Sequence, residues 1–143
     1  MNTAAITFEN ATICQSGKTI LSEVSLEVVK GSFVYLIGKT GSGKSSFMKT
    51  LYGDLSLTSG KGTIVDMDLS ALKDRQIPFL RRKLGVVFQD FKLLPDRSVY
   101  KNLMFVLKAT GWKDLDKMNQ KISEVLKKVG MNDQEHKLPH ELS

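Results

Sequence analysis

The sequence predicts an α/β fold in which a β-rich first part, residues 1–90, leads into a helical second part, residues 91–143. Three observations support this fold class. Apolar and polar residues alternate over residues 20–28, which is typical of a half-buried strand. A strand-like apolar run at residues 33–37 passes through a glycine-rich loop into a helix-like run. Beyond residue 98, apolar residues recur at helical spacing.

The first element is an antiparallel β-layer. We expect short strands at residues 5–8 and 11–14, a turn at 15–18, and a longer strand over 20–28. A Lys-Gly turn then leads into residues 33–37, Phe-Val-Tyr-Leu-Ile. A short continuous apolar run of this kind is typical of a buried strand in a core sheet.

Residues 38–45 read Gly-Lys-Thr-Gly-Ser-Gly-Lys-Ser, a full match to the phosphate-binding pattern G-x-x-x-x-G-K-[ST]. Glycines in such a loop permit left-handed backbone angles and leave room for a phosphate against the main chain. The helix that follows directs N–H groups and a partial positive charge at the same anion. The pattern therefore predicts a nucleoside triphosphate site whose binding residues are Gly38, Lys39, Thr40, Gly41, Ser42, Gly43, Lys44, Ser45 and Ser46.

Two side chains of this loop have predicted chemical roles. The Lys44 ammonium would contact the β- and γ-phosphates of ATP as a catalytic residue, and the Ser45 hydroxyl would ligate Mg²⁺. A glycine-rich turn without a ligand is the alternative interpretation. The strand-like run before the loop and the helix-like run after it favour the nucleotide site.

Further elements follow in order along the chain. We expect a short strand at residues 63–65, one helical turn at 69–73, and a short helix at 77–83 with Pro78 in its first turn. Residues 84–88, Leu-Gly-Val-Val-Phe, read as a second buried strand.

The remainder is helical. Residues 99–110 are strongly apolar over a helical length and are followed by Gly111, a residue that favours a helix end. Apolar residues then recur at helix spacing from Leu115 to Val129, with lysines between them and Gly130 after them. Asp114 precedes this second helix, where an acidic side chain complements the helix dipole.

Composition narrows the classes of function. Apolar residues make up 41% and charged residues 25% of the 143 residues, which suits one globular domain. A single cysteine, Cys14, excludes an internal disulfide, and the longest apolar stretches are far shorter than a membrane span. We expect no secretory signal peptide. The net charge of +6 is spread along the chain without an aromatic platform, so we expect no specific nucleic-acid partner.

The segment IPFLRRKLGVVFQDFKLLPDRSVY, residues 77–100, is far more specific than the loop alone. Together with the loop and residues 57–62, it resembles the nucleotide-binding subunits of ABC transporters, above all those that act in cell division. The resemblance implies a P-loop NTPase fold of ABC type that binds Mg-ATP, dimerises head-to-tail across ATP and hydrolyses it. It also implies an integral membrane permease as partner, reached through the helical subdomain, and a cytoplasmic location on the inner face of the membrane.

The resemblance assigns Gln89 as the Q-loop glutamine, a catalytic residue whose amide would ligate Mg²⁺ or the attacking water. An exposed amide at a strand end is the alternative. In this family an aromatic residue stacks on adenine from the loop after the second strand. That position falls on Cys14, or one residue further on Gln15. Cysteine offers little stacking area, so Cys14 also fits a small buried apolar residue.

The resemblance also predicts an incomplete core sheet. The family's signature motif, Walker B aspartate, adjacent glutamate and switch histidine would all follow residue 143. We therefore expect this chain to be inactive as an ATPase, and residues 33–37 and 84–88 to expose apolar edges that favour aggregation or pairing. Two further interpretations stay open: the ATPase of a lipoprotein-release or macrolide/peptide exporter, and a non-hydrolytic nucleotide- or partner-binding module.

Overall fold

The computed structural model describes residues 4–142, which form two compact units divided after Gly85. This division lies close to residue 90, where the sequence changes from β-rich to helical. The glycine-rich loop lies in unit 1, residues 1–85.

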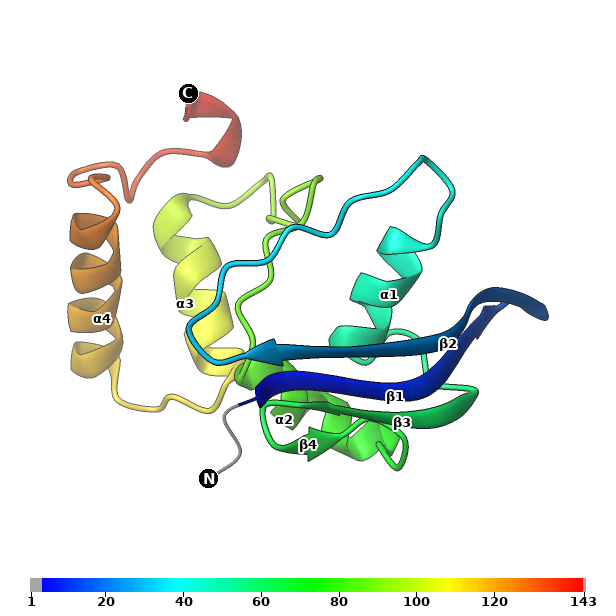
Figure 1. The fold of residues 1–143 in the computed structure, drawn as a ribbon. Coiled ribbons are helices and arrows are strands. Elements are labelled where there is room, and N and C mark those ends of the chain that lie inside the picture. The colour runs from blue at the N-terminus through cyan, green and yellow to red at the C-terminus, as the bar shows by residue number, and fades with distance from the viewer. Residues whose placement is uncertain (1–3, 143) are drawn as a thin grey trace. The chain divides into compact units, whose positions relative to one another are not determined.

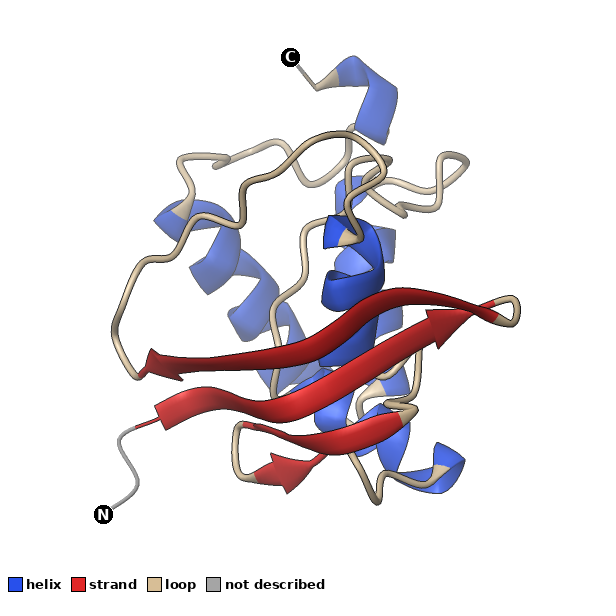
Figure 2. Ribbon diagram, turned by 45° about the vertical axis from the view of Figure 1, so that its right-hand side comes forward, coloured by secondary structure: helices blue, strands red, loops and turns tan. Residues whose placement is uncertain are grey.

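Unit 1 contains a four-stranded antiparallel sheet with the strand order β2-β1-β3-β4 (Figures 1 and 2). Its two long strands, β1 (Ala4–Gln15) and β2 (Lys18–Val29), form a hairpin. The short strands β3 (Ser59–Ile64) and β4 (Met67–Asp68) complete the sheet on the other side of β1. The antiparallel β-layer predicted from the sequence is thus confirmed.

The two short strands predicted at residues 5–8 and 11–14 are one strand, β1. Its register with β2 shifts between Phe8 and Ala11, and Asn10 has a φ of 45°. Such a bulge lets one strand continue while its twist changes locally. The backbone N–H of Asn10 donates to the Ser25 hydroxyl at 2.9 Å, so the bulge is held by a side chain of β2.

Helix α1 (Lys44–Leu51) packs its apolar face against β1, as Figure 1 shows. The rings of Phe8 and Phe47 lie 5.1 Å apart between centroids at the centre of this contact. The short helices η1 (Asp74–Gln76) and α2 (Ile77–Arg82) complete the unit, and α2 confirms the helix predicted there. Apolar burial stabilises the unit in proportion to the area removed from water. The buried apolar members of the core are Phe8, Ala11, Ile13, Phe47, Leu51, Ile64, Leu69 and Leu80.

The predictions for residues 33–37 and 84–88 as strands were wrong for this structure. Both runs lack a paired strand in the part of the chain that the structure describes. All side chains of 33–37 are exposed, with Phe33 at 82% and Ile37 at 85%, and so is the middle of 84–88, with Val87 at 91%. A strand exists only where a neighbour supplies hydrogen bonds along its edge. The expected exposure of these apolar runs is therefore observed.

Two smaller expectations in unit 1 also need correction. The helical turn predicted at residues 69–73 is absent, and the nearest helical turn is η1, which begins at Asp74. The strand predicted at residues 63–65 begins earlier, at Ser59, and ends at Ile64. Val65 and Asp66 have positive φ angles and form the tight turn into β4.

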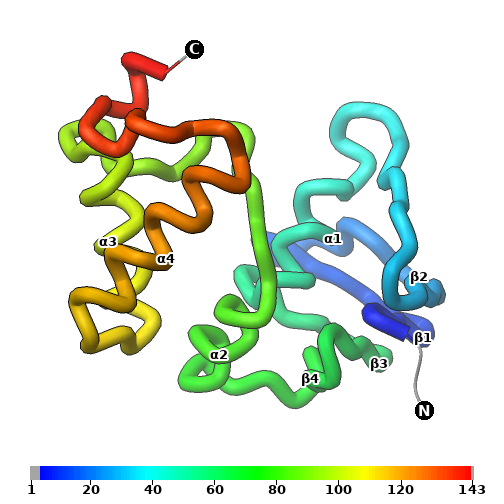
Figure 3. The backbone as a smooth tube through the Cα atoms, turned by 90° about the vertical axis from the view of Figure 1, so that its left-hand side faces the viewer, coloured from blue at the N-terminus to red at the C-terminus, as the bar shows by residue number. Residues whose placement is uncertain are grey.

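Unit 2 is helical, and α3 (Val99–Ala109) lies beside α4 (Leu115–Lys128), as Figure 3 shows. Its buried core is Met104, Met118, Ile122 and Leu126. The Ser98 hydroxyl and the Asp114 carboxylate cap the two helices by accepting from Lys101 N–H and Lys117 N–H. Both predicted helices and their glycine ends are confirmed, and a short turn, η2 (Pro139–Glu141), follows. Among residues 4–142, no helix combines the length and the apolarity that crossing a bilayer requires.

Candidate functional site

The predicted phosphate loop runs from the exposed residues 33–37 to the start of α1 and turns on its glycines. Gly41 and Gly43 have φ angles of 80° and 90°, which residues with a side chain rarely adopt. Gly43 is also closely packed, because a Cβ placed there would lie 2.9 Å from Leu21 Cγ on β2. A Cβ on Gly38 would lie 2.7 Å from Ser42 Oγ. The loop therefore has this shape only with glycine at these positions.

Lys44 folds back over the loop that precedes it. Its Nζ donates to the carbonyl oxygens of Gly38 and Lys39, each at 2.7 Å, and lies 3.5 Å from Ser42 Oγ. The ammonium is thus fixed against the loop by main-chain acceptors and carries its charge to the place where an anion would bind.

The first turn of α1 presents free backbone N–H groups next to this ammonium. Gly43 is the N-cap and has no side chain to cap them, and the first turn contains no acidic residue. The ordinary helical pattern begins with Phe47 N–H, which donates to Gly43 O at 2.8 Å. An uncapped helix start beside a lysine ammonium is a favourable environment for phosphate oxygens.

Two serines in this first turn differ in their surroundings. Ser45 is exposed, so its hydroxyl is open to a ligand. Ser46 is buried, and its hydroxyl donates to Gln15 Oε1 at the end of β1, at 3.0 Å. The sequence prediction included Ser46 among the phosphate-binding residues but missed its contact with Gln15. No motif signals this pairing, because 31 residues separate the two.

Residues 21–143 match the family model described as ABC transporter, which covers most of the chain. The chain belongs to the ABC transporter family. The predicted resemblance is therefore confirmed, and it rests on more than the loop, because the match extends through both units.

Curated relatives point to one branch of the ABC family. The chain is 37% identical over 128 residues to the cell division ATP-binding protein FtsE of Streptococcus pneumoniae serotype 2, with 90% of this chain and 55% of that protein covered. FtsE of Mycobacterium tuberculosis is 41% identical with the same coverage. FtsE of Escherichia coli K12 is 36% identical over 127 residues, covering 89% of this chain and 57% of that protein. The chain spans about half the length of the curated relatives it matches.

Solved structures confirm the predicted fold class. The ATP-binding cassette MJ0796, in a dimeric form bound to ADP and Pi, has a TM-score of 0.80 and 27% identity, covering 96% of this chain and 63% of that one. CbiO1 from Clostridium perfringens, part of the ABC transporter complex cbiONQ, has a TM-score of 0.85 at 24% identity, covering 99% of this chain and 57% of that one. At 24% identity, the similarity to CbiO1 shows a shared fold only.

The loop residues of this ABC chain fit the polyphosphate that the family implies. An ammonium held at the loop, an uncapped helix start and an exposed hydroxyl at Ser45 form a donor set suited to phosphate oxygens. Within residues 4–142, no three His, Cys, Asp or Glu side chains are placed to hold a metal ion. Ser45 and Gln89 as Mg²⁺ ligands stay a prediction from the sequence.

The predicted site residues fall into two units. The residues of the loop come together in unit 1, whereas Gln89 belongs to unit 2, where it is exposed in a turn. The next residue, Asp90, pairs with Lys92 at 2.8 Å, and the hydrogen bond from Lys92 lowers the pKa of the Asp90 carboxyl. Phe91 and Lys92 have φ angles of 55° and 51°, so the segment after Gln89 turns sharply.

Cys14, where the family resemblance places an adenine-stacking aromatic, lies half-buried on β1. Hydrogen bonds with the hydroxyls of Thr58 and Thr19 lower the pKa of its thiol, and Sγ lies 3.5 Å from Thr19 Oγ1. The side chain is thus held between strands and provides no ring for a base. The assignment of the adenine-contacting position to Cys14 or to Gln15 stays a prediction from the family resemblance.

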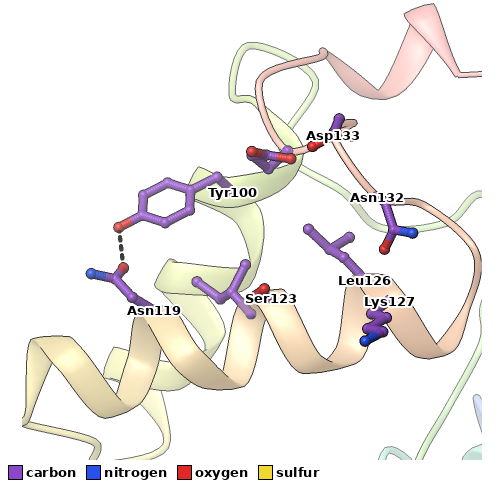
Figure 4. Close-up of a pocket in the computed structure, with 9 residues that line it drawn as sticks. Tyr100, Asn119, Ser123, Leu126, Lys127, Asn132 and Asp133 are labelled. Carbon is purple, nitrogen blue, oxygen red and sulfur yellow. Dashed lines mark hydrogen bonds between the residues drawn. The ribbon is translucent and has the colours of Figure 1, made fainter.

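Unit 2 also contains a hollow of about 540 Å³ beside α4, lined by both polar and apolar side chains (Figure 4). Tyr100 spans one side of it, with its hydroxyl donating to Asn119 Oδ1 at 2.7 Å, and thereby links the first turn of α3 to α4. The other residues that line it include Ser123, Leu126 and Lys127 of α4 and Asp133 of the following loop. None of the residues predicted to bind nucleotide lies in this hollow.

Proposed function

We propose that this chain forms the ATP-binding part of an ABC-type ATPase of the FtsE kind, which couples Mg-ATP binding and hydrolysis to a membrane partner in cell division. One observation carries the proposal: the Lys44 ammonium, bound to the carbonyls of Gly38 and Lys39, lies beside the uncapped start of α1. The similarity to FtsE proteins over most of the chain supports the branch of the family.

Each group of the loop has a defined task in this proposal. The amides of the loop and of the first turn of α1 bind phosphate oxygens, and Lys44 offsets their negative charge. The ammonium has three N–H donors: two are directed at loop carbonyls and the third at Ser42 Oγ, at 3.5 Å the longest of the three contacts, so a phosphate oxygen would take the place of Ser42 while the loop stays closed. When bound, Mg-ATP supplies the phosphoanhydride bond that is cleaved. Ser45 and Gln89 are the proposed Mg²⁺ ligands.

The proposal also covers the membrane partner, the cellular location and the hydrolytic activity of this chain. The partner is an integral membrane, FtsX-like permease, and the contact is made by the Q-loop segment and the helical unit. Exposed apolar side chains at Phe91 and Leu93, 71% and 50% exposed, support a contact surface directly after Gln89. The full-length protein would form a homodimer across ATP and act in the cytoplasm on the inner face of the membrane. The chain of 143 residues would bind nucleotide without hydrolysing it at a useful rate.

Calorimetric titration with Mg-ATP tests the nucleotide site. We expect the wild-type chain to release heat on binding and Lys44→Ala to lose at least about tenfold in affinity, because a charge-assisted contact to phosphate is lost. Lys49→Ala is a matched control, since it removes a lysine from the last turn of the same helix. Equal affinity of wild type and Lys44→Ala would refute the proposed site.

A further inference from the structure

Gln15 connects the end of β1 to the first turn of α1. Its Oε1 accepts the hydroxyl hydrogen of Ser46 at 3.0 Å, although the two residues are 31 positions apart. Ser46 is only 9% exposed, and its carbonyl accepts from Thr50 Oγ1 at 3.0 Å. The hydroxyl and the carbonyl of Ser46 are therefore both hydrogen-bonded. The hydroxyl joins the first turn of α1 to a side chain of the sheet.

The same hairpin supports the loop at a second point. Ile20 and Leu21 at the start of β2 lie so close to Gly43 that a Cβ there would be 3.0 Å and 2.9 Å from them. One apolar and one polar contact thus join the β1–β2 hairpin to the place where the loop becomes helix. Both contacts reach residues predicted to bind the phosphates, Gly43 and Ser46, but only the polar one is a hydrogen bond between side chains.

A hydroxyl has one hydrogen to donate, and that of Ser46 is directed at Gln15. Ser46 can therefore meet a phosphate with its backbone N–H while its side chain remains bound to the sheet. We propose that Gln15 is a positioning residue for the polyphosphate: by accepting from Ser46, it holds the first turn of α1 in the orientation that presents its amides to the ligand. This inference rests on the proposed nucleotide site.

Gln15 provides a hydrogen-bond acceptor without a charge, and both properties are needed to position the first turn of α1 next to an anion. A carboxylate of the same length would accept from Ser46 equally well, but it would add a negative charge next to the start of α1, where the ligand is itself an anion. A neutral amide supplies the acceptor without this repulsion. The proposal therefore makes two separate demands on position 15, an acceptor oxygen and the absence of charge.

The demand for an acceptor is tested with Gln15→Met, which keeps the length and apolar volume of the side chain and removes the acceptor. We expect Mg-ATP affinity by calorimetry to fall by about 3- to 10-fold, the range of one hydrogen bond. Ser46→Ala should show a similar loss of affinity. The double variant, with both substitutions, should bind Mg-ATP no more weakly than the single variant that has the lower affinity. Additive losses in the double variant would overturn the proposal.

The demand for neutrality is tested with Gln15→Glu, which keeps the acceptor and so preserves the fold even if Gln15→Met does not. We expect the loss of affinity to be greater for ATP than for ADP. The difference between the two nucleotides should become smaller in 0.5 M salt, about threefold above the ionic strength at which charges are screened over roughly 8 Å. If Gln15 had only a structural role, Gln15→Glu would lower the affinity for ATP and for ADP equally at all salt concentrations, and this result would overturn the proposal.

Gln76→Glu is the matched control for added charge. Gln76 is an exposed glutamine of the same unit whose Oε1 likewise accepts one hydrogen bond, in this case from the backbone N–H of Lys73 at 3.0 Å. It lies beside α2, whose residue Ile77 packs near Gly53 after the C-terminal end of α1. We expect this variant to bind ATP and ADP as the wild type does.

The outcomes separate this inference from the proposed function. Wild-type ATP affinity in both Gln15 variants, together with a loss in Lys44→Ala, would overturn the role of Gln15 and leave the nucleotide site intact. Absence of ATP binding by the wild-type chain would overturn both. Circular dichroism and the midpoint of thermal unfolding verify that each variant is folded.

Discussion

The side-chain amide of Asn102 on α3 pairs with both backbone groups of Leu94. Leu94 N–H donates to Asn102 Oδ1 at 2.8 Å, and Asn102 Nδ2 donates to Leu94 O at 3.1 Å. The same Nδ2 also lies 2.9 Å from Arg97 O and 3.1 Å from Ser98 O. One side chain thereby closes the loop that leads from the Gln89 segment into α3.

Replacement of Asn102 by alanine should destabilise the chain. The partly buried N–H and carbonyl of Leu94 would both lose their partner at once, and we expect the free energy of unfolding to fall by about 1–3 kcal/mol. Urea unfolding followed by circular dichroism measures this change. Lys101→Ala, at an exposed neighbouring position on the same helix, should leave the midpoint unchanged. Identical midpoints for the two variants would show that the loop is held by other contacts.

Gly43→Ala should impair both folding and nucleotide binding. The φ of 90° strains a residue with a side chain, and the new Cβ would lie 2.9 Å from Leu21 Cγ. We expect a loss of about 2–4 kcal/mol in unfolding free energy, combining backbone strain and overpacking. Gly17→Ala measures the contribution of backbone strain alone, because Gly17 has a φ of 75° but open space around it. A loss no greater than that of Gly17→Ala would contradict the packing argument.

The pH dependence of stability should reveal the ion pairs of α4. Hydrogen bonds from Lys128 and Lys121 lower the pKa of Glu124 from 4.5 to about 2. Because the folded-state pKa is depressed, this contribution is fully present above about pH 4.5 and is lost as the pH falls toward 2.

Glu124→Gln tests this window. The urea midpoints of wild type and variant should differ slightly at pH 7 and converge as the pH falls from 4.5 to 2. The difference at pH 7 should be small, because the side chains are exposed, and 1 M salt should reduce it further. A difference that persists unchanged at low pH would exclude the charge of Glu124 as its origin.

The exposed apolar run at residues 33–37 should drive self-association. Phe33, Tyr35 and Ile37 alternate along it and are 82%, 79% and 85% exposed, so they form one unpaired apolar row. Tyr35→Lys places a charge in the middle of this row, and we expect sedimentation velocity to show a lower fraction of oligomer at equal concentration. Phe105→Lys, at a 52% exposed position of α3, is the control. A monomeric wild-type chain at all concentrations would contradict this expectation.

Local patterns in the sequence were sufficient for most of the elements. The alternation over residues 20–28 predicted β2, Pro78 marked the first turn of α2, and Gly111 and Gly130 marked the ends of α3 and α4. Each of these signals depends on neighbours within a turn or a strand. Residues 33–37 and 84–88 carried an equally clear strand signal, yet pairing requires a distant edge and neither run has one in the part of the chain that the structure describes.

The sequence by itself determined the glycine-rich loop and predicted its phosphate site, because the spacing of Gly38, Gly43 and Lys44 is a local pattern that needs no distant residue. The tertiary structure alone decided what holds that loop in place. It brought Gln15 to Ser46 and Leu21 to Gly43, contacts that no periodicity or motif could indicate. The physical reason is that hydrogen bonds and close packing depend on distances in space, which the folding of the hairpin against α1 sets.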